Sequence, residues 1–133
     1  MANMIRLLIV EDHHHLREQI MLLMGRYEEI IVVGSTYNGE QAVAMCAKLL
    51  PDVVLMDAMM PVMDGFTATE LIRQQFPETR VVILSNGFLG EDIRAQGAGA
   101  SVFLLKPVAP EQMVQAIHTA HADRQNTAGL SAD

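Results

Sequence analysis

Five short apolar runs recur along the chain, and polar residues do not alternate with apolar ones inside them. The runs are Ile5 to Val10, Ile30 to Ser35, Val53 to Asp57, Val81 to Ser85, and Ser101 to Leu105. Runs such as VVLMD and VVILS are typical of strands that are covered by helices on both faces of a parallel sheet. The pattern therefore predicts five buried parallel strands.

Segments with helical periodicity separate these runs. Leu16, Ile20 and Leu23 place one apolar stripe on the first segment, and stripes of this kind cover the faces of a sheet. The third helix is expected from Gly65 to Gln75, and the fifth helix is expected to begin after Pro110, because proline is favoured in a first helical turn. The sequence thus alternates strands and helices five times.

The fourth helical segment, GEDIRAQGAGA, is the weakest of the five. It contains Gly97 and Gly99, and each glycine costs up to about 1 kcal/mol relative to alanine inside a helix. We expect this helix to be short or mobile. Asn38 and Gly39 are expected to start the second helix, with Asn38 able to cap it and Gly39 able to take positive φ.

The repeated strand-helix order predicts an α/β fold with a doubly wound, five-stranded parallel sheet. Ligands of such sheets bind at the carboxyl ends of the strands, near the point where strand order reverses. One domain is expected over residues 1–122. The polar segment 123–133 lacks an apolar period and is expected to be a flexible tail or the start of a linker.

Composition narrows the class of function. The chain has 133 residues, 50% of them hydrophobic, and its net charge is -7, which disfavours direct nucleic-acid binding and gives no sign of a membrane surface. Its single cysteine, Cys46, excludes an internal disulfide and is interpreted as a small packed hydrophobe. No apolar run reaches the roughly 18 residues that span a bilayer, and no signal peptide is recognisable, so a cytoplasmic protein is expected.

Chemically active residue types follow several of the predicted strands. They are Glu11 and Asp12, Asp57, Ser85 and Lys106. Because the carboxyl ends of parallel strands share one edge, we expect these side chains to converge. Three carboxylates there would repel one another unless a hard cation joined them, and oxygen ligands suit Mg²⁺, with Mn²⁺ as an alternative.

Asp57 is the expected nucleophile of this cluster. A carboxylate can attack a phosphoryl group to form an acyl phosphate, while a cation and Lys106 stabilise charge on the transferring oxygens. The hydroxyl of Ser85 offers a hydrogen bond to a further phosphoryl oxygen. The three consecutive histidines from His13 to His15 are interpreted as solvated residues of a first helical turn.

Four motifs together resemble the receiver domain of two-component response regulators. They are LLIVED at 7–12, PDVVLMDAMMPVMDG at 51–65, VVILS at 81–85 and GASVFLLKP at 99–107. The resemblance covers about residues 4–122 and implies a flavodoxin-like topology with strand order 2-1-3-4-5. It further implies a cytoplasmic phosphoprotein that acts in signal transduction.

The resemblance also implies roles for individual residues. Asp57 is then the phosphoacceptor, and the metal ligands are Glu11, Asp12, Asp57 and the backbone carbonyl of Met59. Lys106 contacts the phosphoryl group and precedes a cis proline, while Ser85 and Phe103 form the switch pair. The implied partners are a sensor histidine kinase or phosphotransfer protein as donor, and a downstream protein or fused output domain as target, with phosphorylation-dependent dimerisation as a further option.

Two other functions stay open at this point. A pseudo-receiver would bind partners without being phosphorylated, which Asn86 beside Ser85 and the unusual fourth segment favour. A metal-dependent phosphatase would pass through an aspartyl phosphate, but Met59 leaves no second acid two residues after Asp57. We therefore do not expect an enzyme beyond catalysis of its own phosphorylation and slow dephosphorylation.

Overall fold

Ten elements alternate along the chain in the computed structural model, which describes residues 4–131, with side chains described through Asp123. In order they are β1 (Ile5–Val10), α1 (His14–Met24), β2 (Ile30–Thr36), α2 (Gly39–Leu49), β3 (Val53–Asp57), α3 (Gly65–Gln75), β4 (Arg80–Ser85), α4 (Glu91–Ala98), β5 (Val102–Leu105) and α5 (Pro110–Ser131). The predicted alternation is confirmed, and the strand bounds differ from the expected ones by at most one residue.

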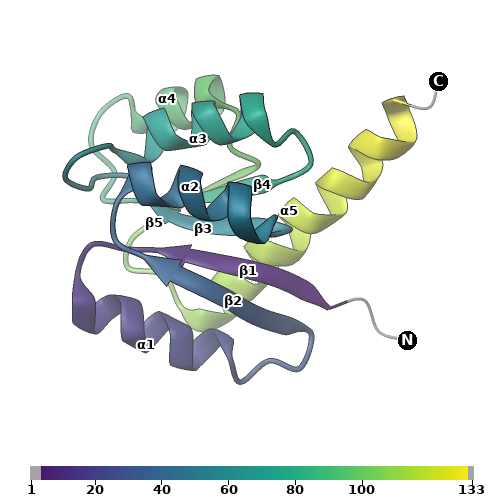
Figure 1. Cartoon of the computed structure of the whole chain (residues 1–133). Coiled ribbons are helices and arrows are strands. Elements are labelled where there is room, and N and C mark those ends of the chain that lie inside the picture. The colour runs from purple at the N-terminus through teal and green to yellow at the C-terminus, as the bar shows by residue number, and fades with distance from the viewer. Residues whose placement is uncertain (1–3, 132–133) are drawn as a thin grey trace.

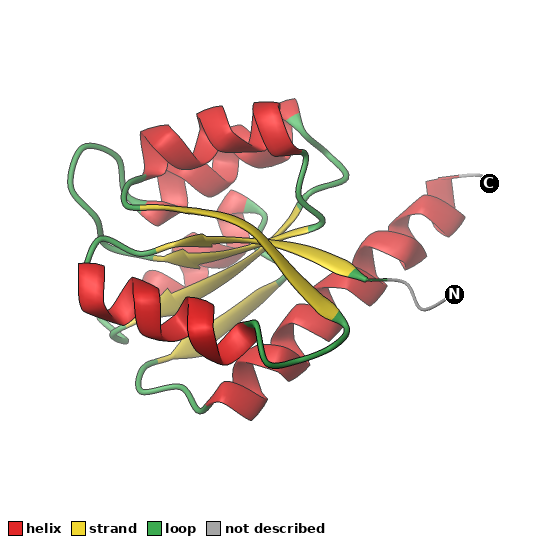
Figure 2. Ribbon diagram, turned by 60° about the horizontal axis from the view of Figure 1, so that its bottom comes forward, coloured by secondary structure: helices red, strands yellow, loops and turns green. Residues whose placement is uncertain are grey.

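The five strands form one parallel sheet in the order β2-β1-β3-β4-β5. This order confirms the predicted doubly wound, flavodoxin-like topology. Figure 1 shows α2, α3 and α4 on one face of the sheet and α1 and α5 on the other, and Figure 2 shows the same layers after rotation. The order reverses between β1 and β3, so the carboxyl ends of these strands flank the crevice expected for a ligand.

Residues within one strand point alternately into two separate cores. Leu7 and Ile9 of β1 pack with residues of α1 and α5, whereas Leu8 and Val10 pack with residues of α2, α3 and α4. Both faces of the central strands are thus buried, as the unbroken apolar runs predict. Cys46 lies in the second core with no exposed surface, and burial raises the pKa of its thiol to about 12.

The start of α2 confirms one expectation and corrects another. The side chain of Asn38 accepts a hydrogen bond from the backbone N–H of Gln41 at 2.8 Å, so Asn38 is the expected cap. Gly39 does not adopt the positive φ that glycine is able to take. A side chain at Gly39 is excluded for another reason, since an added Cβ would lie 2.6 Å from the carbonyl oxygen of Met63.

The last two helices differ from an average helix in length, since α4 is short and α5 is long. Helix α4 has eight residues, which confirms that it is short, and no side chain caps its start at Gly90. Helix α5 continues to Ser131 and so runs through the polar segment that was expected to be a tail. Asp123 lies 3.9 Å from the Nε atom of buried Arg80, which forms a long ion pair between α5 and β4. The division of the chain at residue 122 stays a prediction.

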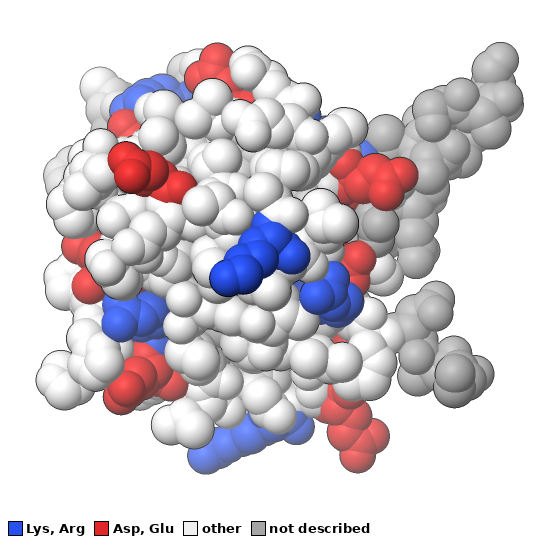
Figure 3. Space-filling model, viewed as in Figure 1, with Lys and Arg blue, Asp and Glu red and all other residues white. Residues whose placement is uncertain are grey.

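Charged residues of both signs are dispersed over the face of the molecule in Figure 3, and most of the surface between them is uncharged. On that face no continuous basic stripe of the kind that tracks a phosphate backbone is visible. Within residues 4–131, no helix has the length and apolar character needed to cross a bilayer.

Candidate functional site: an acidic cluster at the sheet edge

Three segments that are distant in sequence meet at the carboxyl edge of the sheet. Asp57 is the last residue of β3, Glu11 follows β1, and Lys106 follows β5. The Nζ atom of Lys106 lies 2.5 Å from Oδ1 of Asp57 and 3.6 Å from Oε1 of Glu11. The structure therefore brings together the ammonium group and the carboxylates that the sequence places at strand ends.

Burial determines the charge state of this cluster. Asp57 is 4% exposed, and burial together with the neighbouring acids raises the pKa of its carboxyl group to about 6, although Lys106 acts in the opposite direction. Burial disfavours the ammonium form of Lys106, but its contacts with Asp57 and Glu11 prevail and raise the pKa of Lys106. Lys106 is thus a fixed positive charge against a carboxylate that is costly to ionise.

The donor set of the cluster fits a hard cation. Oε1 of Glu11 and Oδ1 of Asp12 are buried and have no hydrogen-bond partner among the described residues. Glu11, Asp12 and His13 each offer a ligand atom within 4.8 Å of the others. Oxygen atoms of this kind without hydrogen-bond donors are what Mg²⁺ or Mn²⁺ prefers. Met59, whose carbonyl is the remaining predicted ligand, lies two residues beyond Asp57.

His13, which the sequence places beside the acidic site, contacts two of its carboxylates. Its side chain is 75% exposed, as the interpretation of the histidines as solvated predicts, yet Nδ1 lies 3.2 Å from Oε2 of Glu11 and 3.4 Å from Oδ1 of Asp12. Its backbone N–H also donates to Oε2 of Glu11 at 3.0 Å. The hydrogen bond to Glu11 and the charge of Asp12 raise the pKa of His13. The only available signal was its position directly after the acids.

Glycine at position 65 allows Asp57 to reach its place. An added Cβ at Gly65 would lie 2.2 Å from the carbonyl oxygen of Asp57, far inside any contact distance. The N–H of Gly65 donates to the carbonyl of Ala58 at 2.8 Å, and Asp64 caps α3 by accepting from the N–H of Thr67 at 2.8 Å. The loop after Asp57 is therefore closed tightly against the end of its own strand.

The predicted switch residues lie on the face of the sheet that α4 covers. Phe103 pairs with Ile83 in the strand register and packs, partly buried, against the core between the sheet and helices α2 to α4. The hydroxyl of Ser85 is bonded to Glu91, the first residue of α4, and is 1% exposed. In the sequence, Glu91 is no more than an acid in a first helical turn, where acids are common.

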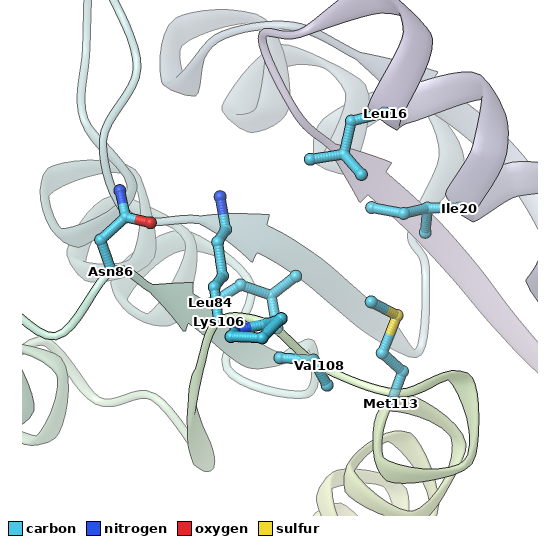
Figure 4. A pocket seen from close by; sticks show the side chains of 8 residues that line it. Leu16, Ile20, Leu84, Asn86, Lys106, Val108 and Met113 are labelled. Carbon is cyan, nitrogen blue, oxygen red and sulfur yellow. The ribbon is translucent and has the colours of Figure 1, made fainter.

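Two cavities adjoin the cluster. One, of about 720 Å³, is lined by the three histidines together with Asp57, Met59 and Lys106. The other, of about 420 Å³, is mostly apolar and lies between α1 and the start of α5. Figure 4 shows Leu16 and Ile20 of α1 facing Val108 and Met113 across this second cavity, with Lys106 and Asn86 at its rim. The acidic cluster thus opens beside an apolar surface.

This geometry agrees with the match of the chain to known proteins. The model of the response regulator receiver domain matches residues 7–118. The chain belongs to this family. Within it, a curated relative is the nitrate/nitrite response regulator protein NarL of Escherichia coli K12, which is 35% identical over 117 residues covering 87% of this chain and 54% of NarL. The chain spans about half the length of the curated relatives it matches.

Solved receiver structures have the same fold. A LuxR-family two-component response regulator from Aurantimonas sp. SI85-9A1 superposes with a TM-score of 0.84 at 31% identity, covering 91% of this chain and 87% of the other. CheY in the CheX-CheY-BeF3-Mg²⁺ complex from Borrelia burgdorferi superposes with a TM-score of 0.77 at 27% identity, covering 86% and 87%. This chain is therefore a receiver domain of two-component signalling.

Proposed function

We propose that this receiver domain takes a phosphoryl group onto Asp57 from a phosphohistidine of a sensor kinase or phosphotransfer protein. The observation that carries the proposal is the contact of Lys106 with Asp57 at 2.5 Å, inside a cluster that also holds Glu11 and Asp12. The buried carboxylate of Asp57 is paired with the ammonium group of Lys106, and the carboxylate oxygens of Glu11 and Asp12 are available to bind a cation.

The transfer is a displacement at phosphorus. An oxygen of the Asp57 carboxylate forms the new P–O bond while the P–N bond of the donor phosphohistidine breaks, and the departing imidazole keeps the electron pair and its ring proton. Lys106 neutralises charge on the phosphoryl oxygens as they approach Asp57. Glu11, Asp12, Asp57 and the Met59 carbonyl would hold Mg²⁺ or Mn²⁺, which supplies electrostatic stabilisation of the transferring group.

The apolar cavity beside the cluster supports a docking place for the donor. It shares Asn86 and Lys106 with the cavity that contains Asp57, so a helix seated against Leu16 and Val108 brings its phosphohistidine to the acidic cluster. Val108→Asp then slows transfer from a phosphotransfer protein at least tenfold and leaves phosphorylation by a small phosphodonor unchanged. Equal slowing with both donors would contradict this docking place.

The output of the domain is binding. Phosphorylation of Asp57 alters the face formed by α4 and β5, where a downstream protein, a fused output domain or a second copy of the chain binds. The match to about half the length of its curated relatives supports a fused output domain in the full protein. We further propose a cytoplasmic location and no direct nucleic-acid contact by residues of this domain.

The test is the intact mass of the protein after incubation with acetyl phosphate and Mg²⁺. Wild type gains one phosphoryl group, and Asp57→Asn gains none. Asp92→Asn, which changes an exposed aspartate of α4 in the same way, serves as the matched control and behaves as wild type. Chelation of the cation abolishes the gain.

Other outcomes would reject the proposal. A mass gain that survives Asp57→Asn would place the phosphoryl group elsewhere. The lack of any adduct in wild type would favour a pseudo-receiver, and repeated release of inorganic phosphate from a phosphomonoester would favour a phosphatase.

A further inference from the structure

The hydroxyl of Ser85 is already engaged in the unphosphorylated domain. Ser85 Oγ donates a hydrogen bond to Oε1 of Glu91 and accepts one from the N–H of Gly87 at 2.9 Å. Ser85 is 1% exposed and Glu91 is 6% exposed. The bond therefore lies in the interior and joins the end of β4 to the first residue of α4.

The chemistry of a hydroxyl group makes this bond exclusive. A serine hydroxyl carries one proton and donates to one acceptor at a time. If Ser85 donates to a phosphoryl oxygen on Asp57, it must leave Glu91. Among the described residues, no second side chain donates to the Glu91 carboxylate and no cation lies within ion-pair distance of it. A buried carboxylate that loses its donor is costly, so Glu91 has to move.

We propose that Glu91 is a positioning residue, which holds the Ser85 hydroxyl away from the phosphoacceptor and transmits its release to α4. This inference rests on the proposed phosphorylation of Asp57. It concerns a residue outside the acidic cluster and outside the pair formed by Ser85 and Phe103. In the unphosphorylated form Glu91 holds the hydroxyl of Ser85. Once Asp57 is phosphorylated, the phosphoryl group competes with Glu91 for this one hydrogen-bond donor and displaces it.

The element that carries Glu91 is suited to move. Helix α4 has eight residues, starts at Gly90 without a side-chain cap and contains Gly97, around which no atom lies within 4 Å of an added Cβ. Arg94 and Ala95 anchor the helix to α3 and the core, so a shift is confined to its first turn, where the freed carboxylate turns toward solvent and is hydrated.

The segment enclosed by the Ser85–Glu91 bond is apolar and exposed. Phe88 is 66% exposed and Leu89 is fully exposed, and both line a groove of about 480 Å³ together with Phe103 and Leu105. Movement of Glu91 changes the shape of this groove directly. The bond thus links the state of Asp57 to an apolar surface without requiring a hydroxyl on Phe103.

The experiment is a spectroscopic titration of the unphosphorylated protein with beryllofluoride in the presence of Mg²⁺, which measures the binding affinity. Beryllofluoride imitates the phosphoryl group, so it competes with Glu91 for Ser85. Glu91→Ala removes the competitor and is expected to tighten binding about tenfold. Glu91→Gln keeps an acceptor but removes its charge, and is expected to tighten binding about threefold because neutral hydrogen bonds are weaker. Asp92→Ala, an exposed neighbour, is expected to leave the affinity unchanged.

The decisive measurement repeats the comparison in a Ser85→Ala background. If Glu91 acts through the hydroxyl, Glu91→Ala has no effect once that hydroxyl is absent, whereas a merely structural role of Glu91 would persist. Unchanged or weakened affinity in both Glu91 variants overturns the inference, and so does a Glu91 effect that survives Ser85→Ala. Failure of wild type to bind beryllofluoride at all would instead overturn the proposed phosphorylation. Glu91→Gln, which preserves the buried shape, keeps the inference testable if Glu91→Ala does not fold.

Discussion

Helices α3 and α4 both follow a strand that ends in a residue of the site, yet they are attached in different ways. After Asp57, the chain is held by the close approach of Gly65 and by the Asp64 cap. After Ser85, the chain enters α4 through Gly90 in the left-handed region, and the Ser85 hydroxyl closes the loop through hydrogen bonds with Glu91 and with the N–H of Gly87. The loop after Asp57 is thus held by close backbone approach and a side-chain cap, whereas α4 begins without a side-chain cap.

Gly65→Ala has the largest expected effect, because it disturbs the tightly closed loop between Asp57 and α3. The new methyl group would lie 2.2 Å from the carbonyl oxygen of Asp57, so the loop must move, and we expect the free energy of unfolding to fall by about 3 kcal/mol or more. Denaturant unfolding measures the loss. Gly97→Ala is the matched control, because the same methyl group meets open space there. An equal loss in both variants would mean that the tight closure after Asp57 is not the cause.

Asp57→Asn tests how much the buried carboxylate of Asp57 lowers the free energy of unfolding. The pKa of Asp57 is raised to about 6, above its ordinary value of 3.8, so between about pH 4 and pH 6 the folded protein binds more protons than the unfolded chain. The free energy of unfolding of the metal-free protein therefore falls as pH rises through this window. At about pH 7.5 the asparagine variant should be more stable than wild type by about 2 kcal/mol.

Unfolding curves measured across this pH range in the absence of divalent cations check that prediction. The variant lacks the Asp57 contribution, so its stability curve should be flatter between about pH 4 and pH 6. Added Mg²⁺ should stabilise wild type and narrow the difference, since a ligand that binds only the folded state raises its stability. Parallel curves for the two proteins would contradict the raised pKa.

Asp64→Ala weakens the start of α3 without filling any space. The loss of the hydrogen bond to the N–H of Thr67 should lower the free energy of unfolding by about 1 kcal/mol. Asp64 also lies 3.7 Å from Arg94 of α4, so Arg94→Ala is measured beside it to subtract that contact. If Arg94→Ala accounts for the whole loss, the cap contributes nothing measurable.

Gly97→Ala, in the uncapped helix α4, has the smallest expected effect. It should raise the free energy of unfolding by about 0.5 to 1 kcal/mol, because alanine is favoured over glycine inside a helix and no atom opposes the added methyl group. Thermal unfolding detects the change as a higher midpoint. A lower midpoint would show that α4 needs the freedom of glycine in the native fold.

The sequence predicted the sheet well because burial on both faces leaves a plain signature in apolar runs. It also indicated which polar residues follow the strands, since Asp57 and Lys106 interrupt those runs at their ends. The contact of Ser85 with Glu91 could not be predicted, because it depends on the left-handed turn at Gly90 folding the loop back onto β4. The continuation of α5 past Ala122 could not be predicted, because the polar segment 123–133 has no apolar period.

The reactivity of Cys46 reports local opening of the native structure. A thiol with a pKa of about 12 and no exposed surface does not meet an alkylating reagent while the protein is intact. Alkylation of this single thiol must therefore wait until α2 separates from the strands beneath it. The rate of labelling in native buffer consequently reports how often that layer detaches, with no label engineered into the chain.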